Sequence, residues 1–195
     1  WVERFFGALD DNADWLTTTL PSDWIDGHRP VGRVYLPTGS YAEMGEWALP
    51  ADEGLAFGAA LRRARAEHRP EARWLRGAIW RNFQVRYREI NDLHKQMLSV
   101  SDQVDGMAPG PARAAALDHL YAGQSNDPYW HGLFGGIYLP DLRVSNGRNL
   151  IVAEDLARTA ASNPEQSGVL VDLDLDGRDE VLLVGDGQIL GVKPD

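Results

Sequence analysis

The chain has 195 residues, of which 44% are hydrophobic and 25% are charged, and its formal net charge is −10. This length supports one sizeable hydrophobic core, or one core and part of a second unit. The negative charge repels phosphate backbones and makes nucleic acid a poor partner. The lack of cysteine excludes disulfides and thiolate metal sites, and no apolar run approaches the about 20 residues that span a bilayer.

The first third of the sequence carries three local signals. "WVERFFGALDDNADWL" spaces Trp1, Phe5 and Leu9 for a short amphipathic helix. The apolar triplet at 34–36 predicts a short buried strand that ends at "PTGS". A second helix is expected from about Asp52 to His68. The start at Trp1, without a leader, indicates a start inside a longer protein, and we expect a cytoplasmic location.

The strongest periodic signal is "RGAIWRNFQVRYREINDLHKQMLSVSDQV", which predicts one helix of roughly 25 residues. One face of it holds residues at alternating steps of four and three: Phe83, Tyr87, Ile90, His94, Met97 and Ser101. A turn at 105–111 separates this helix from a shorter one at 112–121. Irregular backbone should then give way to a helix from about Leu150 that Asn163-Pro164 closes.

The C-terminal segment changes its period from helical to alternating. "GVLVDLDLDGRDEVLLVGDGQILGVK" carries turn signals at Asp176-Gly177 and Asp186-Gly187. It predicts three short antiparallel strands, which we interpret as the opening of a β-domain. The chain is therefore expected to be mainly α, with a short C-terminal β meander.

The stretch "SNDPYWHGLFGG", residues 125–136, is the first candidate site. Asn126 or Asp127 can cap a helix whose first turn holds Pro128. Its three glycines would each cost about 1 kcal/mol in a helix relative to alanine, a cost accepted where a backbone or a ligand comes close. Two interpretations stay open: a capped helix packed against a neighbour, with His131 in the core, or a ligand site whose aromatic rings suit sugars.

The stretch "SYAEMGEWALP", residues 40–50, is the second candidate. Glu43 and Glu46 are three residues apart and could form an acid/base pair of the kind that glycoside cleavage requires. Alternatively, both carboxylates begin a helix and favour its positive end. Spacing alone leaves both interpretations open.

The stretch "DLDLDGRDE" is the third candidate. Asp172, Asp174 and Asp176 precede a glycine, and Glu180 stands at the ninth position, a pattern of oxygen ligands that suits Ca²⁺. It is not an EF-hand, because the twelfth position is Leu183 where that motif requires glutamate. The alternative is a polar hairpin whose acidic side chains face water.

Four segments in this order resemble glycoside hydrolase family 57, in its 4-α-glucanotransferase and α-amylase branch: "LPTGSYAEMGEWALP", "IWRNFQVRYREINDLHKQMLSVS", "NDPYWHGLFGGIYLPDLR" and "DLDGRDEVLL". In that family an incomplete (β/α)₇ barrel is followed by a helical bundle and then by a large β-sandwich. The resemblance implies that residues 1–50 end the barrel, 51–163 form the bundle and 164–195 begin the sandwich.

The family's segment "NDxYWHG" reaches the sugar cleft, with its tryptophan against the bound glucan, and Pro128 is a mild departure from the pattern. The resemblance implies an α-1,4-glucan or maltooligosaccharide as partner and these substrate-binding residues: Asn126, Asp127, Tyr129, Trp130, His131, Tyr41, Glu43 and Trp47. No cofactor is expected to be required, with Ca²⁺ as the one candidate ion. A homodimer of the full-length enzyme stays open.

The resemblance also implies which chemistry the chain lacks. The family's nucleophile is a glutamate and its general acid an aspartate, on barrel strands that precede Trp1, and no segment here resembles those that hold them. The parent enzyme would be retaining, with its two carboxyl groups about 5 Å apart. We therefore assign no catalytic residue and expect the isolated chain to be inactive. The alternative function is a non-catalytic helical module for glucan binding or dimerisation.

Overall fold

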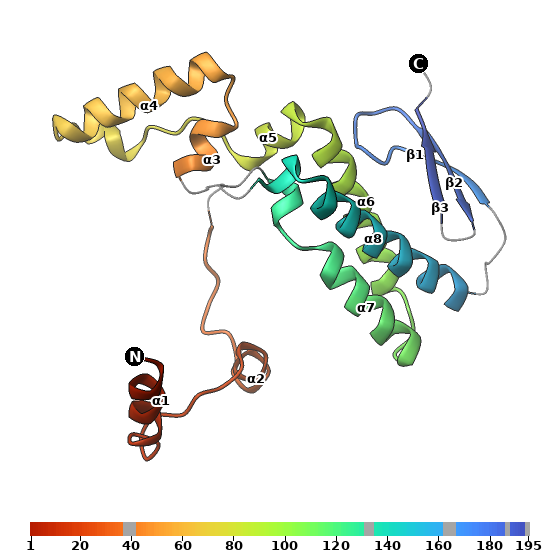
Figure 1. Ribbon diagram of the computed structural model, residues 1–195, viewed down its shortest axis with the longest axis horizontal. Helices are drawn as coiled ribbons and strands as arrows, with labels where there is room; N and C mark the ends of the chain where they lie inside the picture. The colour runs from red at the N-terminus through yellow and green to blue at the C-terminus, as the bar shows by residue number, and fades with distance from the viewer. Residues whose placement is uncertain (37–41, 131–134, 162–166, 186–187, 194–195) are drawn as a thin grey trace. The chain divides into compact units, whose positions relative to one another are not determined.

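A computed structural model of the chain describes residues 1–36, 42–130, 135–161, 167–185 and 188–193. It divides into two compact units, Trp1–Gly39 and Ser40–Asp195. The division of the sequence at residues 50 and 163 stays a prediction. The second unit carries most of the helices and the sheet (Figure 1), so the fold is mainly α, as the sequence predicts.

The first unit contains helices α1 (Val2–Asp10) and α2 (Pro21–Gly27). The buried strand predicted at 34–36 is wrong, because residues 28–36 form neither helix nor strand and the side chains of Val34 and Leu36 are 79% and 80% exposed. Apolar character alone does not make a strand. A strand needs a neighbour for its backbone hydrogen bonds, and the described residues of this unit offer none.

The second unit begins with α3 (Ala42–Trp47), α4 (Ala51–Ala66) and a 3₁₀ turn, η1 (Pro70–Arg73). Helix α4 starts and ends within two residues of the prediction. Glycines let α3 lie close to α4, since a Cβ at Gly58 would stand 2.7 Å from the carboxylate of Glu46. A Cβ at Gly77 would stand 2.0 Å from the carbonyl oxygen of Gly45, so this contact requires glycine.

The single helix of roughly 25 residues predicted within the stretch 76–104 is instead two helices, α5 (Trp80–Arg86) and α6 (Arg88–Asp105). Tyr87 separates them with φ −113° and ψ 88°, which is not helical. The apolar period survives the break because Phe83 and Ile90, on either side of it, are both fully buried. A hydrophobic period shows which residues meet the core and does not show that the backbone between them is continuous.

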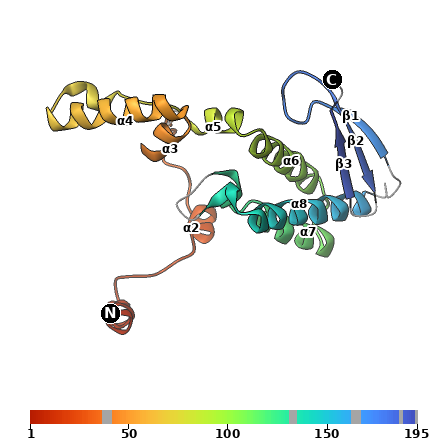
Figure 2. The same ribbon diagram turned by 45° about the horizontal axis from the view of Figure 1, so that its top comes forward.

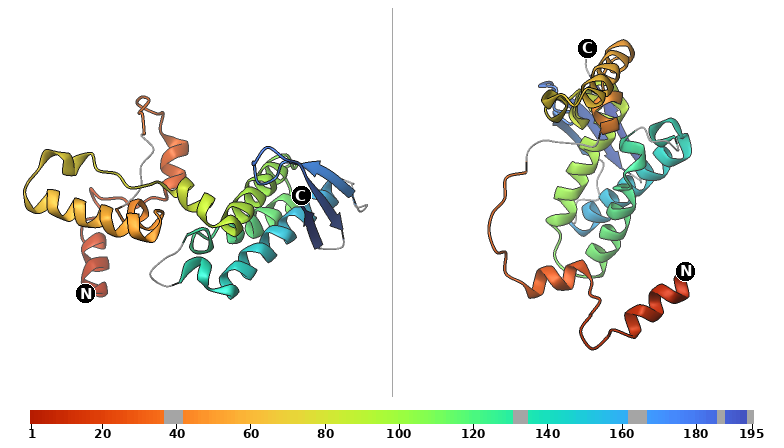
Figure 3. Two further views of the ribbon diagram at one scale, coloured as in Figure 1. Left: turned by 90° about the horizontal axis from the view of Figure 1, so that it is seen from above. Right: turned by 90° about the vertical axis from the view of Figure 1, so that its left-hand side faces the viewer.

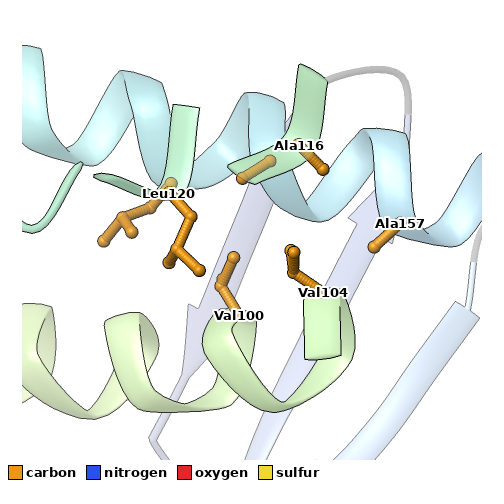
Figure 4. Packing of buried hydrophobic residues seen from close by; sticks show 7 residues of the cluster. Val100, Val104, Ala116, Leu120 and Ala157 are labelled. Atoms are coloured by element: carbon orange, nitrogen blue, oxygen red, sulfur yellow. The ribbon is translucent and has the colours of Figure 1, made fainter. Parts of the chain in front are cut away.

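Helices α6, α7 (Pro111–Gly123) and α8 (Pro140–Ala160) lie side by side as a three-helix bundle (Figure 3). The start predicted for the last helix, Leu150, is wrong by ten residues, because Pro140 occupies the first turn, where proline is favoured. The core of the bundle is small and aliphatic (Figure 4): Val100, Val104, Ala116, Leu120, Leu150, Ala153 and Ala157.

The three predicted strands form one antiparallel sheet in the order β1-β2-β3: β1 (Ser167–Val171), β2 (Glu180–Gly185) and β3 (Gln188–Val192). Val169 pairs with Leu182, and Leu183 pairs with Leu190. The sheet lies beside α6 and α8 (Figure 2), and residues of these helices and of the sheet line a common hollow of about 320 Å³. In the described part of the chain, no helix is long and apolar enough to cross a membrane.

Glu154 of α8 makes the stability of the bundle depend on pH. Its side chain is buried, and this burial raises its pKa above the ordinary value of 4.5, although Arg158 and a hydrogen bond from Gln103 oppose the shift. Between pH 4.5 and the raised pKa, the folded chain holds a proton that the unfolded chain has lost. The free energy of unfolding therefore falls as the pH rises through that window.

Glu154→Gln removes this fall in the free energy of unfolding, because the side chain of glutamine does not ionise. We expect the melting temperature of the variant to exceed that of the wild type by a margin that widens from pH 4.5 upward and then levels off. Thermal denaturation followed by circular dichroism from pH 4.5 to about 7.5 measures the margin. A margin that does not change with pH would show that Glu154 is not the group responsible.

Candidate functional site

An aromatic cluster surrounds Trp130, whose side chain is only 8% exposed. Its ring lies 4.1 Å from that of Phe83 in α5 and, nearly parallel, 6.4 Å from that of Trp47 in α3, measured between ring centroids. Tyr129 is also buried. Two stretches that the sequence singles out separately, around residues 47 and 130, therefore meet in one cluster.

The described residues 126–130 and 135–138 form two 3₁₀ turns and extended backbone, and not the capped α-helix of the first interpretation. Asp127–Tyr129 forms a single 3₁₀ turn, η2, in which Pro128 occupies the first positions and the side chain of Asn126 makes no cap. Trp130 is extended, and its carbonyl oxygen accepts a hydrogen bond from the N–H of Ile137 in a second turn, η3 (Gly136–Tyr138). Gly135 has φ +106°, which favours glycine. His131 and Gly132 lie outside the described residues.

Three side chains hold this segment against the helices. Trp80 Nε1 donates a hydrogen bond to the carbonyl oxygen of Tyr129 at 2.9 Å, and the Tyr129 hydroxyl donates to the carbonyl oxygen of Gly123 at 2.6 Å. Burial raises the pKa of Tyr129 to about 12. Buried Asn146 of α8 donates to the carbonyl oxygens of Gly123 and Ser125. The segment is thus fixed by donors from α5 and α8 that lie far away in the sequence.

A hollow of about 310 Å³ opens beside this segment. Its size is at the lower end of the about 300–1,000 Å³ range of ligand pockets, and its walls combine rings with a few polar groups, as is typical of such pockets. The residues that line it come from α3, α5, α6 and the segment itself: Met44, Trp80, His94, Met97, Gln124, Asn126, Tyr129 and Trp130.

His94 is a pocket residue that the sequence interpretation placed on the apolar helix face and did not assign to a site. Its ring meets those of Trp80 and Tyr129 edge-on, with centroids at 4.8 Å and 6.2 Å. Burial, and secondarily Lys95, lowers its pKa, which favours the neutral ring. Its buried Nδ1 has no hydrogen-bond partner among the described residues. A titratable side chain within an otherwise apolar stripe is the sequence signal that could have found it.

The other predicted contacts divide between the cluster and the surface. Trp47 belongs to the cluster, whereas Asn126 and Asp127 are exposed. Glu43 lies in the first turn of α3, and the carboxylate of Glu46 faces Gly58 of α4. Glu43 therefore belongs to a helix start, as in the second interpretation of that stretch, whereas Glu46 stands one residue before the end of α3. Tyr41 lies outside the described residues.

The acidic stretch gathers its side chains in the loop between β1 and β2. Carboxylate oxygens of Asp172, Asp174 and Asp176 all lie within 4.8 Å of one another. Glu180, the first residue of β2, accepts a hydrogen bond from the backbone N–H of Leu173 at 2.8 Å. These aspartates occupy a loop and not a strand, so strand alternation does not govern which way they face.

Comparison with known proteins gives consistent matches over the whole chain. Residues 78–157 match the family described as "Alpha-amylase/4-alpha-glucanotransferase, middle domain". A 4-alpha-glucanotransferase of Thermococcus litoralis and an alpha-amylase of Pyrococcus abyssi are each 37% identical to the chain, covering 100% of it and 28% of their own lengths.

The crystal structure of the 4-alpha-glucanotransferase from Thermococcus litoralis matches all of the chain and 29% of that protein, with 36% identity and a TM-score of 0.66. The chain therefore spans less than a third of the length of these relatives. The matches confirm the resemblance to the 4-α-glucanotransferase and α-amylase branch of glycoside hydrolase family 57.

Proposed function

We propose that this chain, whose residues 78–157 belong to the alpha-amylase/4-alpha-glucanotransferase middle-domain family, is the central helical part of a retaining α-1,4-glucan-acting enzyme. Its role in this proposal is to complete the sugar cleft. The full enzyme would carry out the transfer or hydrolysis, with catalytic carboxylates contributed from outside this chain. The isolated chain would bind sugar without turnover.

The observation that carries the proposal is the hollow beside residues 124–130. Trp80, which is half-buried, and Trp130, which is nearly enclosed, both line it with aromatic rings. Aromatic rings match the apolar faces of pyranose rings. Asn126 and His94 are polar residues that line the same hollow, and amide and imidazole groups can form hydrogen bonds with sugar hydroxyls. A neutral imidazole offers both a donor and an acceptor.

Asn126→Ala is the sharpest test of this site. Trp130→Ala would remove a buried ring that packs against Phe83 and Trp47, so its effects on binding and on folding would be mixed. Asn126 is exposed and lines the hollow. Its truncation should weaken binding of maltoheptaose about two- to tenfold, the equivalent of about 0.5–1.5 kcal/mol for one hydrogen bond, and leave the melting temperature unchanged.

Tryptophan fluorescence of the 195-residue chain, titrated with maltoheptaose, measures this affinity. A β-linked oligosaccharide of similar length is the sugar control. Arg148→Ala, at an exposed position of α8, is the variant control and should bind as the wild type does. An equal response to both sugars would contradict glucan specificity.

The same substitution in the full-length enzyme separates a misplaced site from one that needs a second wall. If Asn126 contacts sugar only when the rest of the enzyme closes the cleft, the chain alone responds weakly, while kcat/KM of the full-length Asn126→Ala variant falls. Unchanged kcat/KM in that variant would exclude Asn126 from the site. A different combination would favour the non-catalytic binding module. In that case the isolated chain would respond selectively to glucan, while Asn126→Ala would leave kcat/KM of the full-length enzyme unchanged.

A further inference from the structure

His94 is a titratable side chain in the wall of the hollow beside residues 124–130. Tyr129 is the other titratable residue among the described residues that line it. Burial raises the pKa of Tyr129 to about 12, so its hydroxyl stays neutral and donates to the carbonyl oxygen of Gly123. The remaining lining residues carry no charge: Met44, Trp80, Met97, Gln124, Asn126 and Trp130. The described wall of the hollow therefore contains no carboxylate that could balance a charge on His94.

The two ring nitrogens of His94 have different surroundings. Nδ1 is buried and has no hydrogen-bond partner among the described residues. Nε2 is not one of the buried atoms that lack a partner, and none of the described residues forms a hydrogen bond with it. Nε2 is therefore the ring nitrogen that water, or a ligand in the hollow, can reach.

The contacts of His94 oppose a positive charge on its ring. The rings of Trp80 and Tyr129 meet the imidazole edge-on. The charged group that acts on it is Lys95, the next residue of α6, whose positive charge also disfavours protonation. A protonated ring would carry a hydrogen on Nδ1 with no acceptor and a charge with no opposite partner, and both are costly. The pKa of His94 accordingly lies below the ordinary value of 6.5.

A glucan in the hollow would make protonation of His94 still less favourable. In the empty hollow, water at Nε2 can solvate the charge of an imidazolium ring. A sugar that fills the hollow of about 310 Å³ displaces this water and replaces it with neutral hydroxyl groups. Removing water from a charged group is costly unless an opposite charge takes its place. Glucan and the proton should therefore each weaken the binding of the other.

We propose that the hollow binds glucan only while His94 is neutral, so that acid releases the sugar by protonating the imidazole ring. This inference rests on the proposed function of the hollow and adds its regulation. Nε2 of His94 forms a hydrogen bond with a sugar hydroxyl, for which a neutral ring can supply either the donor or the acceptor. Below the pKa of His94, the Kd for maltoheptaose should rise by up to about tenfold per pH unit, the limit for competition with one proton.

Isothermal titration calorimetry of the 195-residue chain with maltoheptaose tests this competition. The titrations are made at about pH 8 and about pH 5, between which histidine changes its charge, and circular dichroism checks that the chain is folded at both. Binding should be weaker at the lower pH. His94→Gln keeps a side chain that donates and accepts hydrogen bonds but cannot ionise, so it should retain glucan binding and lose the pH dependence.

His119→Gln is the matched control, because His119 lies on α7, where its Nδ1 is paired with Asn149 Oδ1 at 2.9 Å. This variant should keep the pH dependence of the wild type. A purely structural role of His94 predicts a different result: His94→Gln would change the melting temperature or the affinity and leave the pH dependence in place.

NMR titration of the imidazole C–H resonances measures the same coupling through the proton. Saturating maltoheptaose should lower the pKa of His94, whose resonance is identified by its absence from the spectrum of His94→Gln. A pKa of His94 that maltoheptaose leaves unchanged, or a pH dependence that survives in His94→Gln, would overturn the inference.

The outcomes also separate this inference from the proposed function. Glucan-selective binding of equal strength at both pH values would overturn the regulation by His94 and leave the proposed function standing. An absence of selective binding at either pH would overturn the inference, because the hollow of this chain would then not hold glucan. In that case kcat/KM of the full-length Asn126→Ala variant decides whether the proposed function falls as well.

Discussion

Leu150→Ala is expected to lower the free energy of unfolding by about 2–5 kcal/mol, the usual cost of truncating a buried leucine. Leu150 is fully buried in the core of the bundle, which α6, α7 and α8 form together. A Cβ added at Gly123 would lie 2.7 Å from its side chain, so α7 approaches with bare backbone. Because Gly123 has no side chain that could move into the space, the cavity should collapse little. Urea denaturation followed by circular dichroism measures the change.

Val144→Ala is the matched control on the same helix. Its side chain is 68% exposed, so the substitution should change stability by less than about 0.5 kcal/mol. A cost for Leu150→Ala no larger than that of the control would show that the bundle is not packed around Leu150.

Phe83→Ala should be at least as damaging, at about 3–5 kcal/mol, and it should also be visible in tryptophan fluorescence. Phe83 is fully buried, and its ring lies 4.1 Å from that of Trp130 and 4.5 Å from that of Tyr87. Removing the phenyl ring takes away a packing partner of Trp130 and exposes the indole ring to water. The tryptophan emission of the folded variant should therefore shift to longer wavelength. Thermal denaturation and emission spectra measure the two effects.

Val85→Ala is the control for this substitution, because Val85 lies on the same short helix with its side chain 80% exposed. It should leave both stability and emission unchanged. The comparison also separates scaffold from contact: Phe83→Ala should reduce glucan response together with stability, whereas Asn126→Ala should reduce the response alone. A Phe83→Ala variant with native stability and native emission would contradict the packing described for Trp130.

The sequence predicts best those elements whose signals are local. Helix α4 is indicated by the acidic residues of its own first turn. Helix α7 is indicated by a Gly-Pro pair that places Pro111 at its first position. The C-terminal meander follows from alternation between turn residues. In each case the deciding interactions join residues a few positions apart, so pattern and propensity suffice.

Elements that depend on distant partners were predicted poorly. The helix break at Tyr87 leaves the apolar period intact, and Tyr87 there shares a hydrogen bond with the hydroxyl of Tyr138, 51 residues away. The first ten residues of α8 include the polar Ser145 and Asn146, which are typical of loops. In the folded chain, Asn146 donates hydrogen bonds to the carbonyl oxygens of Gly123 and Ser125, and these partners cannot be identified from the sequence. The apolar triplet at 34–36 predicts a strand, but a strand also needs a second strand to pair with. The sequence of the triplet does not show whether one is present.

The candidate site divides in the same way. The sequence by itself determined that residues 126–130, with their clustered rings and polar groups, and the acidic stretch from Asp172 to Glu180 were candidates, because those residue types are adjacent in the chain. Only the tertiary structure brought Trp80 and His94 to the first of these and Lys193 to the second. Those neighbours are chosen by how helices pack and strands pair, and such contacts depend on the whole buried surface.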